Sequence, residues 1–135
     1  MRSCRAFVAL VACSCWAVAG CSADSSPRAT AAGQAAASFA QVVRGQPDAA
    51  CALLAPDTRQ ELEDSSGPCP QGIADVKLPD AGRVLSVQVF GLDAIVRLEH
   101  DTMFLALFDA GWRVTAAGCT PQEEDRPYAC HLKGA

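Results

Sequence analysis

The chain is predicted to be an α+β protein in which N-terminal helices pack on a curved antiparallel β-sheet of four to five strands. Early in the folded region, apolar residues recur at every third or fourth position, as in amphipathic helices. After residue 83 they recur at every second position between Gly- and Asp-containing turns, as in a β-meander. Helices followed by strands is the element order of an α+β domain. Because such sheets curl, we expect a cone-like interior.

The first half of the folded region predicts two helices and a short continuation. The first helix covers Ala29–Arg44 and ends at Gly45, a common C-terminal stop. Its inward face carries small residues and one aromatic: Ala32, Ala35, Ala36, Phe39, Ala40 and Val43. Pro47 starts the second helix, which Pro56 breaks, and a short charged continuation covers Asp57–Asp64.

The second half predicts strands that alternate inward and outward residues. In Val84–Phe90, the apolar face is expected to hold Leu85, Val87 and Val89. The remaining strands are Ala94–His100 with inward Ala94, Val96 and Leu98; Met103–Phe108; Trp112–Ala116 with inward Trp112, Val114 and Ala116; and an edge strand within Tyr128–Lys133.

The predicted strands carry more aromatic side chains than the helices on one face of the sheet could bury. The surplus consists of Phe90, Phe104, Phe108 and Trp112. Phe104 and Phe108 lie on one side of their strand, whereas Met103, Leu105 and Leu107 lie on the other. One set is expected to line an interior pocket or to face a partner, since apolar patches mark interaction sites. The alternative is that strand curvature hides both sets within one core.

The N-terminus has the pattern of an export signal. Arg2 and Arg5 precede an apolar run, Ala6–Gly20, which is shorter than the ~20 residues of a membrane-spanning helix. The run ends in Val18-Ala19-Gly20-Cys21, which resembles the lipobox of bacterial lipoproteins. This resemblance implies acylation of the Cys21 thiol by palmitate-type chains and cleavage before Cys21. The protein would then be anchored on the extracytoplasmic face of the cell membrane. An ordinary signal peptide is the alternative.

The expected organisation is a signal peptide at residues 1–20, a lipidated flexible tether at 21–34 and a single domain at 35–135. From Cys21 onward the chain has 9 Lys/Arg and 15 Asp/Glu, a net charge of −6 against −4 for the whole sequence. An acidic domain without a basic patch repels phosphate backbones, so nucleic acid is excluded as a partner.

Four cysteines follow Cys21, and in an exported domain they predict two disulfides, for which three connectivities exist. Cys51–Cys69 and Cys119–Cys130 are favoured, because each pair brackets a loop rich in Gly, Pro and charge. A zinc site with His131 or His100 is the weaker alternative, since no C-x2-C pair is present. No metal and no cofactor is expected.

Several segments resemble small envelope lipoproteins of high-GC bacteria. They are Cys51-Ala-Leu-Leu-Ala-Pro, Gly111-Trp112-Arg113-Val114, Gly118-Cys119-Thr120-Pro121 and Tyr128-Ala129-Cys130. These proteins are similar to the cystatin-like, nuclear-transport-factor-two-like cone fold. Because the family largely lacks an assigned activity, the resemblance implies a fold and a location rather than a reaction.

The sequence contains no assembled catalytic constellation, and no catalytic residue is assigned. Enzymes of the cone fold place an Asp base and a Tyr or second Asp in a pocket. The corresponding candidates are Tyr128, Asp101 and His100. The expected function is therefore a non-catalytic binding or accessory domain for a protein partner or a small apolar ligand. The alternative is a cone-fold isomerase or hydrolase that acts on an apolar substrate.

Overall fold

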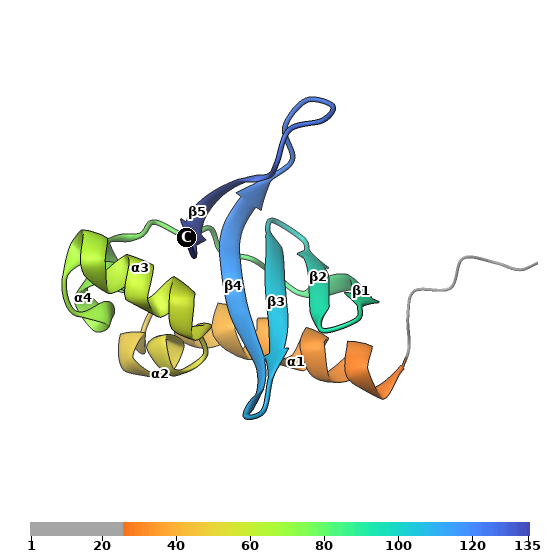
Figure 1. Ribbon diagram of the computed structural model, residues 1–135, viewed down its shortest axis with the longest axis horizontal. Coiled ribbons are helices and arrows are strands. Elements are labelled where there is room, and N and C mark those ends of the chain that lie inside the picture. The colour runs from red at the N-terminus through yellow and green to blue at the C-terminus, as the bar shows by residue number, and fades with distance from the viewer. Residues whose placement is uncertain (1–25) are drawn as a thin grey trace, which may run out of the picture.

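A computed structural model describes residues 26–135, so the predicted signal peptide at residues 1–20 and the predicted lipidation site Cys21 lie outside the described part. Four helices precede a five-stranded sheet (Figure 1). The helices are α1 (Pro27–Val42), α2 (Pro47–Ala52), α3 (Pro56–Ser66) and α4 (Cys69–Asp75). The strands are β1 (Val84–Phe90), β2 (Asp93–Leu98), β3 (Thr102–Phe108), β4 (Gly111–Thr120) and β5 (Ala129–Lys133).

The sheet is an antiparallel meander in the order β1-β2-β3-β4-β5. Helix α1 runs across one face, and α2, α3 and α4 gather near the β4–β5 side (Figure 1). The α+β class with helices packed on an antiparallel sheet is thereby confirmed. Within residues 26–135, no helix is long and apolar enough to cross a bilayer.

Helix α1 begins at Pro27, two residues before the predicted start at Ala29. Its residues 27–34 were predicted to belong to a flexible tether, and this prediction is wrong. Pro27 occupies the first turn, where its missing N–H costs nothing. The side chain of Ser26 caps the helix by accepting the N–H of Ala29 at 3.2 Å. Ala29 and Ala32 are buried, so this first half of α1 is part of the packed domain.

The core lies between α1 and the inner face of the sheet. Phe39 is its largest fully buried side chain, with no exposed surface. The inner face of the sheet supplies Ala94, Val96, Leu98, Met103, Leu105, Trp112, Val114 and Leu132. The small residues of α1 let it approach closely: a Cβ added at Gly33 would lie 3.1 Å from Val87 Cγ2.

Helix α4 was not predicted from the sequence. It is short, it contains a proline in its first turn and a glycine, and it buries only Cys69, Gly72 and Ile73. The Cys51–Cys69 disulfide ties it to α2, as predicted. A Cβ at Gly72 would lie 3.0 Å from Leu62 Cγ, so this glycine permits α4 to pack on α3. Tertiary packing, rather than helix propensity, therefore stabilises α4.

Two irregularities in strand pairing correct the predicted faces. In β1 the register shifts between Val84 and Ser86, which turns Leu85 out to 58 % exposure. The prediction that Leu85 is inward beside Val87 and Val89 is wrong, and Val84 packs on the core instead. In β4 the register shifts beside Thr115, so Ala116 pairs with Phe104 on the outer face rather than following Val114 inward. A β-bulge resets alternation in this way.

Candidate functional site

An open groove of about 660 Å³ lies on the outer side of β3 and β4, away from α1. Its floor is formed by Phe104, Ala106 and Phe108, which occupy successive outward positions of β3. The walls come from β4, the start of α3, the segment before β5 and the last residues of the chain: Ala55, Asp57, Thr58, Thr115, Ala116, Pro127, Tyr128, Cys130, Lys133, Gly134 and Ala135. The groove therefore collects side chains that are far apart in the sequence.

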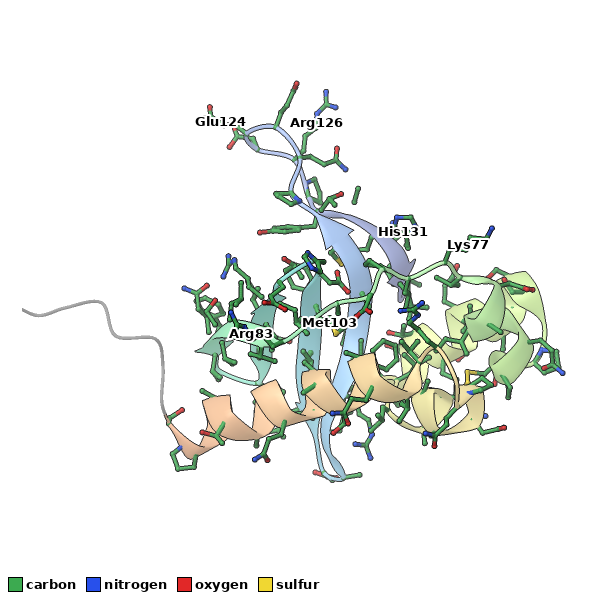
Figure 2. All side chains as sticks on the ribbon, turned by 180° about the vertical axis from the view of Figure 1, so that it is seen from behind. Lys77, Arg83, Met103, Glu124, Arg126 and His131 are labelled. Carbon is green, nitrogen blue, oxygen red and sulfur yellow. A yellow bond between two sulfur atoms is a disulfide. The ribbon has the colours of Figure 1, made fainter. Side chains whose placement is uncertain are left out.

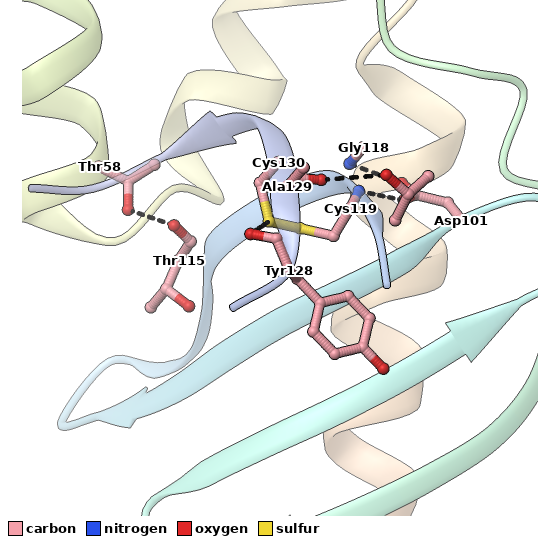
Figure 3. The surroundings of a disulfide bond; sticks show 9 residues. Thr58, Asp101, Thr115, Gly118, Cys119, Tyr128, Ala129 and Cys130 are labelled. Carbon is pink, nitrogen blue, oxygen red and sulfur yellow. Dashed lines mark hydrogen bonds between the residues drawn. A yellow bond between two sulfur atoms is a disulfide. The ribbon is translucent and has the colours of Figure 1, made fainter. Parts of the chain in front are cut away.

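The bulge in β4 positions the α3 wall. Thr115 is the unpaired residue between the pairs Leu105–Val114 and Phe104–Ala116. Its carbonyl accepts the hydroxyl hydrogen of Thr58 at 2.9 Å and the N–H of Gly134 at 3.2 Å (Figure 3). The N–H of Ala55 donates to the carbonyl of Val114 at 2.8 Å. These bonds hold the start of α3 against the edge of β4 and so fix one side of the groove.

Tyr128 forms the opposite side. Its ring contacts Phe104 edge-on, with ring centroids 5.1 Å apart and an interplanar angle of 76°. Such a contact adds ~0.5–1.5 kcal/mol beyond the area it buries. Two residues further on, Cys130 is bonded to Cys119 on the neighbouring strand, which confirms the second predicted disulfide (Figure 3). The disulfide closes the hairpin that carries Tyr128 and thereby keeps this wall in place.

Asp101 is a structural clamp behind the same hairpin. Its side chain is buried, and its carboxylate accepts the N–H groups of Gly118 at 3.1 Å and Cys119 at 3.0 Å (Figure 3). Gly118 has φ of +65°, and a Cβ there would lie 2.8 Å from Leu78 Cδ2, so the position requires glycine. Asp101 thus fixes the backbone of β4 at Gly118 and at the disulfide-bonded Cys119.

Burial raises the pKa of Asp101 above its ordinary value of 3.8. The backbone N–H groups of Gly118, Cys119 and Thr102 and the charge of His131 act in the opposite direction, because they favour the ionised carboxylate. Desolvation is the larger effect.

The four apolar residues predicted to form a binding surface, Phe90, Phe104, Phe108 and Trp112, lie in three different places in the structure. Phe104 and Phe108 line the groove, and Phe108 is 40 % exposed. Trp112 is 6 % exposed and belongs to the core, so its assignment to a binding surface is wrong. Trp112 lies two residues from Val114 and so shares with it the inner face of the sheet. Phe90 is exposed at the end of β1, outside the groove.

The catalytic candidates are also separated. Tyr128 lines the groove, whereas Asp101 and His100 do not. His100 is exposed, and its backbone N–H donates to the carbonyl of Ala81 in the turn after β2. The groove therefore does not bring Tyr128 together with Asp101 or His100, the other two predicted catalytic candidates. Across residues 26–135, no cluster of three or more His, Cys, Asp or Glu side chains could hold a metal ion.

The groove is lined by one negatively and one positively charged side chain. Asp57 lies on the α3 wall and Lys133 on β5, and both are exposed. The acidic residues near Glu124 lie elsewhere: Figure 2 shows Glu124 and Arg126 on the β4–β5 loop, which projects beyond the sheet. The floor of the groove is apolar and its lining side chains carry one charge of each sign, so it suits an apolar ligand.

The chain matches no protein-family model, no curated protein and no solved structure.

Proposed function

We propose that this protein is a lipid-anchored envelope protein that binds an elongated apolar group, such as an acyl chain, in the groove lined by Phe104, Phe108 and Tyr128. The anchor is the acylated Cys21 implied by the lipobox. We also propose that the protein is related to the small envelope lipoproteins with a cone fold that its sequence resembles. The observation that supports binding is the groove itself: an aromatic floor on the sheet face that α1 leaves uncovered.

The dimensions of the groove suit this ligand class. Its volume of about 660 Å³ is within the ~300–1,000 Å³ of small-molecule sites. Phe104 and Phe108 are separated by four residue steps along an extended strand, a distance of roughly 13 Å. Since the lining side chains Asp57 and Lys133 balance in charge, the apolar chain rather than a head group should dominate affinity. Dodecanol and dodecanoate are therefore expected to bind with similar affinity.

The Phe104→Ser, Phe108→Ser double variant tests the groove. It should weaken binding of a dansyl-labelled fatty acid by about 2 kcal/mol, roughly thirtyfold in Kd, because two aromatic contacts with the chain are lost. Fluorescence titration of the purified protein measures this change. Phe90→Ser is the control, because Phe90 is an exposed phenylalanine of the same sheet that lies outside the groove. Equal affinity of the double variant and the wild type would rule the groove out as the binding site.

The two disulfides provide a second comparison. Replacing either pair by serines should lower the free energy of unfolding by about 3 kcal/mol, on the chain-entropy model for loops of 11 and 18 residues separation. Only loss of Cys119–Cys130 should also weaken ligand binding, since it releases the hairpin that holds Tyr128. Chemical denaturation and the same titration check both effects. A similar loss of affinity on removing Cys51–Cys69 would contradict the assignment of the Tyr128 wall.

A further inference from the structure

One edge of the sheet carries most of the exposed apolar surface. Among residues 26–135, four large apolar side chains are exposed, and three of them lie on β1 or in the turn after it. They are Leu85 at 58 %, Phe90 at 57 % and Leu92 at 61 %, whereas the fourth, Phe108, belongs to the groove. Strand β1 pairs only with β2, so this edge is open. Exposed large apolar side chains along one open edge are typical of an interaction surface.

The start of α1 lies on this same edge. Ala29, Thr30 and Gly33 line a shallow surface together with Val84 and Leu85. Figure 1 places β1 and the first turn of α1 on one side of the molecule and α3 and α4 on the opposite side. The chain thus enters the domain beside Leu85. The groove, in contrast, is walled by α3 and by β5, the strand farthest from β1 in the sheet.

The distance to the anchor is short. Five residue steps separate Cys21 from Ser26, and an extended chain of that length reaches at most about 18 Å. An acylated Cys21 at the bilayer surface would keep the start of α1 within that reach. The tether also raises the local concentration of lipid at this edge far above that of any free partner.

We infer that the β1 edge rests on the bilayer that holds the lipid anchor, with Leu85, Phe90 and Leu92 entering its interfacial region. This inference rests on the proposed acylation of Cys21. Interfacial apolar groups reach ~5–10 Å into the headgroup–acyl boundary, a depth that side chains on one strand and its turn can attain. Arg28, exposed in the first turn of α1, adds a cation beside anionic headgroups. The α3 and β5 walls of the groove then lie on the side of the domain that is farther from the membrane.

Depth-dependent quenching tests the contact. The mature lipidated protein is reconstituted into phosphatidylethanolamine–phosphatidylglycerol vesicles with or without brominated acyl chains. Phe90→Trp places a fluorophore on the edge, and Gln60→Trp places one at an exposed position of α3 on the opposite side. Both carry the same background from Trp112, which is buried in the core. Bromine should quench the tryptophan at position 90 and leave that at position 60 unchanged.

A second variant and a flotation assay separate the possible failures. Leu92→Trp reports on the same edge and should be quenched like Phe90→Trp. If the protein floats with the vesicles and neither edge variant is quenched more than Gln60→Trp, the inference is wrong and the anchor stands. If the protein does not float, the proposed anchor fails, and the membrane contact fails with it.

Discussion

Replacing Phe39 by alanine is expected to lower the free energy of unfolding by about 4 kcal/mol, one of the two largest effects expected of a single substitution in this domain. Phe39 has no exposed surface and lies at the centre of the cluster between α1 and the inner sheet face. Truncation leaves a cavity that Val96 and Met103 cannot fill from their fixed strand positions. Since small domains have only ~5–15 kcal/mol of stability, this loss should be visible as a large fall in Tm.

Chemical denaturation of the Phe39→Ala variant measures this loss of stability, provided that the dependence of the unfolding free energy on denaturant concentration is the same as in the wild type. Phe39→Leu is the matched control, because it retains most of the buried volume and should cost less than half as much. Equal stability of the alanine variant and the wild type would mean that α1 does not pack on the sheet as described.

Replacing Asp101 by alanine is expected to have the second large effect. It would leave the buried N–H groups of Gly118 and Cys119 without an acceptor, at about 2 kcal/mol each, or about 4 kcal/mol together. Asp101→Asn should cost less, because its one carbonyl oxygen can still accept one of the two bonds. Asp109→Ala, at an exposed turn position, should be neutral. Thermal and chemical unfolding of the three variants distinguishes the buried clamp from an ordinary turn residue.

The pH dependence of this effect has a definite sign. The folded-state pKa of Asp101 is raised above 3.8, so the folded chain binds this proton more tightly than the unfolded chain. The stability that Asp101 contributes is therefore complete below 3.8 and falls as the pH rises through the raised pKa. The difference in unfolding free energy between wild type and Asp101→Asn should shrink over that interval. A difference that grows with pH would show that hydrogen bonding, rather than desolvation, dominates the pKa.

Local patterns in the sequence predicted much of the fold. The spacing of Ala32, Ala36 and Phe39 predicted the buried face of α1, and period-two alternation predicted the strands and most of their inward residues. The pairing of Cys51 with Cys69 and of Cys119 with Cys130 was also predicted. These features depend on neighbours within a few turns or within one loop, which is why a single sequence reveals them.

The errors arise where distant segments decide the local structure. The bulges at Leu85 and Thr115 depend on how the partner strand pairs, so alternation alone misplaced Leu85 and Ala116. Helix α4 exists because Cys69 is bonded to α2 and Gly72 fits against Leu62. Asp101 reads as a turn residue, yet its hydrogen-bond partners are 17 and 18 residues away.

The candidate site was predicted in part. The doubly apolar strand Met103–Phe108 indicated that one of its two sets could face a pocket or a partner, without showing which one. Phe104 and Phe108 are that set, and both line the groove. Tyr128 was considered only for catalysis, although its ring contact with Phe104 makes it a wall of the groove. The wall from α3 could not be predicted, because it depends on the Thr58 hydroxyl finding the unpaired carbonyl of Thr115.

An NMR titration of the wild-type protein with dodecanoate tests the central proposal most directly, because it locates the bound chain without any substitution. Amide and side-chain shifts should change at Phe104, Ala106, Phe108, Thr115 and Tyr128, while the inner-face residues around Phe39 stay constant. Shift changes confined to β1 and the start of α1, or no saturable change at all, would contradict binding in the groove.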